Sequence, residues 1–179
     1  ALCLDADYQV TPELINELRC TIRADAEAID ALIIPFRYLV FGRPLRQSVY
    51  PAKVVMFRPS RCRYIDDGHT QLVTAAGPTL TLRSPILHDD RKPLSRWFWA
   101  QERYARLEAD KLLSLPRHQL RPVDRLRRLH VMAPFAILLM CLIGRQGLLD
   151  GWRGWFYAFQ RMIAEMMLSL LLWERRHGH

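Results

Sequence analysis

Three clusters of acidic residues combine residue types and spacings that suit metal or proton-transfer chemistry. The first is Asp5-Ala6-Asp7, in which two carboxylates two positions apart can turn toward one divalent cation. Such an ion is hard and prefers oxygen ligands. Mg²⁺ or Mn²⁺ held there can neutralise a diphosphate leaving group. Acids with this spacing also occur in loops and helix caps, so the motif alone is weak evidence for a metal site.

The second cluster is Asp66-Asp67-Gly68-His69. Either of its two carboxylates can take a proton from a hydroxyl group, as the general base of a transfer reaction does. The alternative is a tight Asp-Asp-Gly turn with a surface histidine. The residues by themselves favour the turn.

The third cluster runs from His88 through Asp89 and Asp90 to Arg91 and Lys92. A histidine beside carboxylates can complete a metal shell, while Arg91 and Lys92 can neutralise phosphate oxygens. The alternative is an acidic entry to a helix with solvated basic neighbours.

These clusters follow segments that the hydrophobic pattern predicts as strands of an α/β fold. The pattern predicts a buried strand at 2–4, a helix at 11–24, a strand at 31–41 interrupted near Pro35, a basic loop at 42–51, a strand at 54–57 and a last strand at 80–88. Strand ends along one edge of an open α/β sheet line a common crevice. We therefore expect the three clusters to converge there.

Beyond His88 the pattern changes to helices. We expect residues 1–115 to form the α/β part and residues 116–130 to form a basic linker. Residues 131–179 are predicted to form an apolar helical hairpin.

The hairpin has features of a membrane-associated segment. Residues 131–143 are fewer than the roughly 20 needed to cross a bilayer. The final helix, predicted at 155–173, carries a stripe formed by Arg161, Glu165 and Ser169. Because burying both charges in lipid is costly, an in-plane hairpin suits these features better than a span. The alternative is that the helices pack on each other or on a second subunit of a homo-oligomer.

Tryptophan and arginine residues indicate which surface the hairpin meets. Trp152, Trp155 and Trp173 suit a membrane interface, and a basic run of Arg125, Arg127 and Arg128 suits an anionic cytoplasmic leaflet.

Composition points to a polyanionic partner. Lys and Arg number 26 against 18 Asp and Glu, giving a net charge of +8. Nucleic acid is not the expected partner, because the basic residues are spread along the chain and form no known binding motif. A non-catalytic basic module that binds anionic lipid or nucleic acid is the alternative to an enzyme. The four scattered cysteines predict reduced thiols. Ala1 opens within the first predicted strand, so we expect a preceding stretch to be absent.

Longer strings carry a resemblance that covers essentially the whole chain. They are Leu4-Asp5-Ala6-Asp7-Tyr8 with Thr11-Pro12-Glu13-Leu14, Asp66-Asp67-Gly68-His69-Thr70, His88 to Trp97, Gln101-Glu102-Arg103-Tyr104-Ala105 and Leu149-Asp150-Gly151-Trp152. The chain thereby resembles family 2 glycosyltransferases, which have the GT-A fold. It is most similar to the bacterial branch near the lipopolysaccharide-core glucosyltransferases. The resemblance implies an incomplete GT-A-like, Rossmann-related mixed sheet followed by apolar helices.

The resemblance also implies roles for particular residues. Asp5 and Asp7 would serve the metal and the nucleotide diphosphate, His88 would be a further metal ligand, and Asp66 or Asp67 would be the base. Relatives often have His-Glu where this chain has His69-Thr70, which leaves the choice of base open. The Gln-x-x-Arg-Trp motif of processive synthases is absent.

The implied reaction is an inverting, non-processive, metal-dependent transfer of one sugar. The sugar moves from a nucleotide diphosphate donor to a glycan or glycolipid acceptor of the bacterial envelope. The implied location is the cytoplasmic face of the inner membrane. In the family, the strands that bind uracil and ribose precede the Asp-x-Asp motif. We therefore expect the 179-residue chain alone to bind nucleotide sugar weakly.

Overall fold

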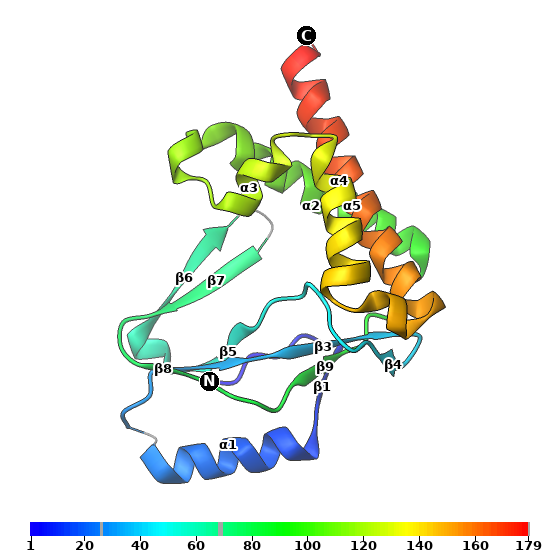
Figure 1. Ribbon diagram of the computed structural model, residues 1–179. Helices are drawn as coiled ribbons and strands as arrows, with labels where there is room; N and C mark the ends of the chain where they lie inside the picture. The colour runs from blue at the N-terminus through cyan, green and yellow to red at the C-terminus, as the bar shows by residue number, and fades with distance from the viewer. Residues whose placement is uncertain (26, 68–69, 179) are drawn as a thin grey trace. The chain divides into compact units, whose positions relative to one another are not determined.

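The computed structural model describes residues 1–25, 27–67 and 70–178 and divides the chain into two compact units (Figure 1). The first unit contains Ala1–Asp66 and Gln71–Arg91, and the second contains Asp67–Thr70 and Lys92–His179. The fold is mixed α/β, as expected. The division falls ahead of the long helix α2 (Leu94–Ser114), whereas the sequence placed it after residue 115. Helix α2 belongs with the C-terminal helices because its buried face packs on α5 (Trp152–His177).

The first unit is built from short strands and one helix. Its elements are β1 (Tyr8–Val10), α1 (Pro12–Asp25), β2 (Ala31–Ile34), β3 (Phe36–Val40), β4 (Arg43–Pro44), β5 (Lys53–Phe57), the 3-10 turn η1 (Pro59–Arg61), β8 (Thr79–Thr81) and β9 (Ile86–His88). Strands β6 (Cys62–Asp67) and β7 (Thr70–Ala75) pair with each other, and their ends at 67 and 70 belong to the second unit. One sheet has the order β1-β9-β3-β4 and another the order β5-β2-β8.

The strand predictions are confirmed in part. The interruption near Pro35 is confirmed, since β2 and β3 flank it. The single strand predicted at 80–88 is wrong, because β8 and β9 belong to different sheets. Between them, the backbone N–H groups of Arg83 and Ser84 donate to the carboxylate of Glu17 at 2.8 and 2.7 Å. Although desolvation opposes it, these hydrogen bonds together lower the pKa of Glu17.

The first residues of the chain lie along β5. Ala1 and Phe57 exchange two backbone hydrogen bonds, and the N–H of Cys3 donates to the carbonyl of Val55. The strand predicted at 2–4 is not formed: Leu2 makes only an isolated bridge with Met56. The prediction that the segment is buried is wrong, because Leu2 and Leu4 are 46% and 41% exposed.

Helix α1 closes the core of the first unit. Its N-terminus is capped as predicted, since the Thr11 hydroxyl accepts the N–H of Leu14 at 3.2 Å. The buried core consists of Leu14, Leu18, Leu32, Ile34, Val55, Leu82 and Ile86. It therefore joins the helix to strands of both sheets.

The second unit is helical. After α2 come the 3-10 turn η2 (Arg117–Gln119), α3 (Pro122–Arg127), α4 (Met132–Leu139), the π-helical turn η3 (Met140–Gly144), the 3-10 turn η4 (Gly147–Asp150) and α5. The linker predicted at 116–130 instead contains η2 and α3. Leu120 and Asp124 in it are buried, so this segment is a packed part of the unit. Among the helices that the model describes, none has a stretch long and apolar enough to cross a membrane.

A buried network of charged groups joins α2, α3 and α5. Arg127 on α3 donates to Glu165 on α5 at 2.8 Å and to Glu108 on α2 at 3.1 Å. Lys111 lies 3.3 Å from Asp124 and 2.5 Å from Asp67. The sequence placed Arg127 in a run facing an anionic leaflet. That placement is wrong, because the three helices bring buried carboxylates around it.

The close approach of α5 to η4 requires a glycine. A Cβ on Gly154 would lie 1.8 Å from the carbonyl oxygen of Gly147, which is backbone and cannot rotate away. We expect Gly154→Ala to lower the free energy of unfolding of the second unit by about 1–3 kcal/mol. Urea denaturation followed by tryptophan fluorescence measures this, because all 5 tryptophans lie in that unit.

Gly144→Ala is the matched control for that experiment. A Cβ at Gly144 would meet the sulfur of Met140, which is the end of a flexible, exposed side chain. An equal loss of stability in both variants would contradict the steric explanation.

Candidate functional site

The structure brings together two of the predicted site residues, Asp7 and His88. Antiparallel pairing of β1 with β9 sets Tyr8 opposite His88. The Nε2 atom of His88 then lies 3.4 Å from a carboxylate oxygen of Asp7. His88 is buried, whereas Asp7 is partly exposed. The buried imidazole and the partly exposed carboxylate form a donor pair that solvent can reach from the Asp7 side.

The residues after His88 secure this corner. The N–H of Asp89 donates to the carbonyl of Asp7 at 3.0 Å, and the buried Asp89 carboxylate accepts a 2.6 Å hydrogen bond from Arg91. Arg91, expected to neutralise phosphate, thus contacts Asp89. Lys92 is exposed and begins the second unit.

Three tyrosines surround His88. The ring centroids of Tyr8, Tyr38 and Tyr50 lie 5.2, 4.9 and 4.7 Å from that of the imidazole, each in an edge-on arrangement. Phe36 packs on Tyr8 and Tyr50 behind them. Edge-on packing from several sides restricts rotation of the histidine ring.

A chain of polar groups runs beside the imidazole. The ammonium of Lys53 donates to the hydroxyl of Tyr50 at 2.9 Å, and the hydroxyls of Tyr50 and Tyr8 lie 2.8 Å apart. Burial raises the pKa of Tyr8, and the hydrogen bond to Tyr50 and the charge of Asp5 raise it further. Tyr8 therefore stays protonated. Asp5 is exposed and joins the cluster through Tyr8.

Sequence reasoning missed the tyrosines and Lys53. Tyr50 was counted only as part of a basic loop, and Tyr38 only as an apolar strand residue. Parallel pairing of β3 with β9 sets Tyr38 opposite His88, and no local pattern in the sequence reveals that pairing. The adjacency of Tyr8 to Asp7 was the one local signal available.

The two candidate bases have different surroundings. Asp66 is exposed and accepts a 3.2 Å hydrogen bond from Gln71. Asp67 belongs to the second unit, where it pairs with Lys111 at 2.5 Å and with Arg121 at 3.2 Å. Gly68 and His69 of the same motif lie outside the described residues.

The described part of the chain shows no group of three or more His, Cys, Asp or Glu residues placed to hold a metal ion. Two donors are present in the Asp7–His88 pair. Mg²⁺ is commonly held by one or two carboxylates together with phosphate oxygens and water, and Asp7 supplies the carboxylate of this pair. The pair therefore fits an ion that shares its coordination with a diphosphate.

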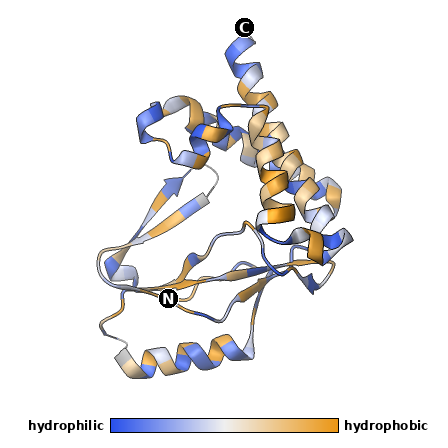
Figure 2. Cartoon of the chain, in the orientation of Figure 1, coloured by the Kyte–Doolittle hydropathy of each residue, from blue (hydrophilic) through white to orange (hydrophobic). Residues whose placement is uncertain are grey.

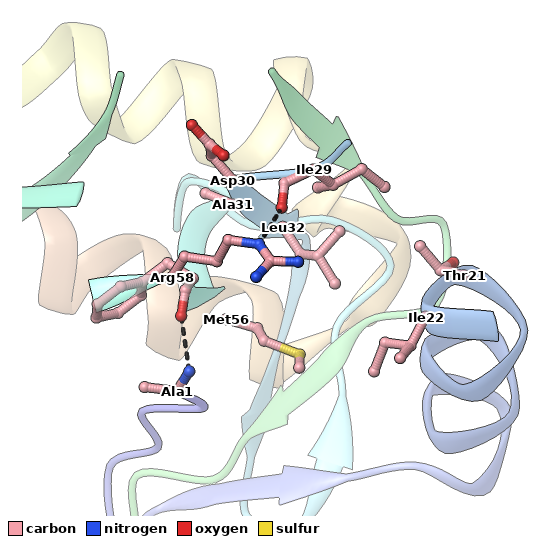
Figure 3. Close-up of a pocket in the computed structure, with 10 residues that line it drawn as sticks. Ala1, Thr21, Ile22, Ile29, Asp30, Ala31, Leu32, Met56 and Arg58 are labelled. Atoms are coloured by element: carbon pink, nitrogen blue, oxygen red, sulfur yellow. Dashed lines mark hydrogen bonds between the residues drawn. The ribbon is translucent and has the colours of Figure 1, made fainter. Parts of the chain in front are cut away.

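The first unit also contains a cavity of about 250 Å³ (Figure 3). It is lined by Ala1, Thr21, Ile22, Ile29, Asp30, Ala31, Leu32, Met56, Phe57 and Arg58. Its polar groups are engaged within the protein: Arg58 donates to the carbonyl of Ile29, and Asp30 pairs with Arg61. None of the residues proposed for chemistry lines it.

Comparisons with known proteins identify no relative. No family model matches the chain, and neither a curated protein nor a solved structure matches it.

Proposed function

We propose that this chain is part of a metal-dependent, inverting, non-processive glycosyltransferase with a GT-A-like fold. It would transfer one sugar from a nucleotide diphosphate sugar to a glycan or glycolipid acceptor of the bacterial envelope, at the cytoplasmic face of the inner membrane. The observation that carries the proposal is the 3.4 Å approach of His88 to Asp7 at the end of paired β1 and β9. The resemblance to family 2 glycosyltransferases supplies the reaction class.

Asp7 and His88 are the residues that would hold the metal ion. A divalent cation there supplies charge neutralisation for the departing diphosphate. Other groups of the chain hold these two residues in place. The tyrosines pack around the imidazole ring, and the N–H of Asp89 donates to the carbonyl of Asp7.

Lys53 adds a positive charge beside Tyr50, one of the three tyrosines that surround His88. Its ammonium is held over the Tyr50 ring, 4.5 Å from the centroid. A lysine in this position is suited to pair with phosphate oxygens.

Either Asp66 or Asp67 would accept the proton of the acceptor hydroxyl. Asp66 is exposed to solvent, whereas the carboxylate oxygens of Asp67 pair with Lys111 and Arg121. We expect Asp66→Asn to remove more transfer activity than Asp67→Asn if Asp66 is the base, and the reverse order if Asp67 is.

The test uses protein expressed from the complete reading frame that encodes this chain. Release of nucleoside diphosphate from a panel of nucleotide sugars is followed with lipid-linked glycan acceptors, in Mn²⁺, in Mg²⁺ and after chelation. We expect release with at least one donor, and only when the metal is present. No metal-dependent release from any donor in the panel would overturn the proposal.

A further inference from the structure

Helix α5 has its polar side turned inward. Arg161, Glu165 and Ser169 lie four residues apart and form the polar stripe of the helix, yet Glu165 and Ser169 are buried. Glu165 pairs with Arg127, and the Ser169 hydroxyl donates to the carbonyl of His130 or of Glu165. Glu165 and Ser169 are therefore used within the second unit and do not face water.

The other side of α5 presents apolar side chains to the outside. The exposed large residues recur at intervals of three, four and seven, which places them on one helical face. They are Trp152, Trp155, Phe159, Met166, Leu170 and Trp173. We call this set the α5 stripe.

The neighbouring α4 and η3 carry a second stripe. Val131, Phe135, Leu139 and Ile143 follow at intervals of four and are all more than half exposed. Helix α4 packs against α5 within the same unit. Figure 2 shows α4 and much of α5 in the colours of hydrophobic residues. Exposed apolar surface of this extent marks an interaction site on a folded protein.

Basic groups stand at both ends of the α5 stripe. At the first end lie Arg145 and Arg153, and the guanidinium of Arg153 stacks over the Trp152 ring at 4.7 Å. At the other end lie Glu174, Arg175 and Arg176, directly after Trp173, and Arg175 pairs with Asp110. Tryptophan rings bordered by arginines match the boundary between acyl chains and anionic headgroups.

We propose that the two stripes form a docking surface for an anionic lipid bilayer, with α4 and α5 lying in the plane of the interface. Charge favours this occupant over a second copy of the chain. The chain carries a net charge of +8, so it is attracted to an anionic bilayer and repelled by a second copy with the same charge. The inference goes beyond the proposed sugar transfer and does not depend on it.

Vesicle flotation tests this inference. The protein is mixed with vesicles of phosphatidylcholine and phosphatidylglycerol, or of phosphatidylcholine alone, without any nucleotide sugar. We expect flotation with the anionic vesicles, a blue shift of tryptophan emission and quenching by brominated lipid. Partitioning into neutral vesicles should be weaker. Equal partitioning into both, or none into anionic vesicles, overturns the proposal.

Variants locate the surface. Phe159→Glu should reduce partitioning into the vesicles at least tenfold, because the contact of the ring with the acyl chains is lost and a negative charge is added. Arg145→Gln and Arg176→Gln should each reduce it about fivefold. Ile65→Glu is the matched control, since Ile65 is similarly exposed but lies in the first unit. Unchanged partitioning of Phe159→Glu, with retained helical circular dichroism, overturns the assignment of the surface.

The oligomeric state tests the alternative that a second copy of the chain covers the two stripes. Sedimentation in buffer without lipid should give the same mass for the parent protein and for Phe159→Glu. A dimer that Phe159→Glu dissociates would overturn the proposal and identify the stripes as a subunit interface.

Discussion

Replacing Arg127 with methionine is expected to destabilise the second unit by about 3–5 kcal/mol. The guanidinium donates to Glu165, Glu108 and Asp124, whose side chains are 7%, 6% and 1% exposed. Although desolvation opposes it, the charges of these carboxylates raise the pKa of Arg127, so the group stays charged. Without it, Glu165 loses the cation it pairs with, and Glu108 and Asp124 each lose one of the cations around them.

Urea denaturation followed by tryptophan fluorescence measures this loss, since the tryptophans report on the second unit alone. Arg127→Lys should lose less stability than Arg127→Met, because lysine keeps the positive charge. It should still be less stable than the parent protein, because lysine cannot donate two parallel hydrogen bonds to Glu165. Arg106→Met is the control: Arg106 pairs with Glu102 on the exposed side of α2, and its removal should change stability little.

The network also predicts a partial rescue. In Arg127→Met with Glu165→Leu, one uncompensated carboxylate is removed together with the cation. The double variant should therefore be more stable than Arg127→Met alone. If the double variant were the less stable of the two, the buried network would not be what holds α3 to α5.

Asp7→Asn and His88→Ala are each expected to lower the rate of metal-dependent sugar transfer about 100-fold or more. Asparagine keeps the size of Asp7 but removes the negative charge beside His88. Alanine at position 88 removes the imidazole that the tyrosines orient. Both changes weaken the donor pair that would hold the cation.

Mn²⁺ binding followed by electron paramagnetic resonance gives a readout that is independent of transfer. Losing a residue that only hydrogen-bonds to a metal ligand already weakens metal binding by about tenfold or more. Loss of a direct ligand should therefore weaken Mn²⁺ binding at least tenfold. Glu13→Gln is the matched control, because Glu13 is an exposed acid in the first turn of α1. Unchanged Mn²⁺ binding in His88→Ala would remove His88 from the proposed ligand set.

Local chemistry in the sequence determined several features by itself. The helix start at Thr11-Pro12 and the strand break at Pro35 follow from capping and from the missing N–H of proline, which act within a few residues. The association of Asp7 with His88 was expected from strand ends at a sheet edge, but it arises differently: Asp7 precedes β1, and antiparallel pairing of β1 with β9 brings it to His88.

Only the tertiary structure decided which strands pair and which side of each helix is covered. The segment 80–88 divides into β8 and β9 because they pair in different sheets, and Glu17, far away in the sequence, binds the backbone between them. The tyrosines around His88 come from three separate segments. The periodicity of α5 showed that the helix has a polar and an apolar side. It did not show that the polar side is buried, because Arg127 and His130, which satisfy Glu165 and Ser169, come from another part of the chain.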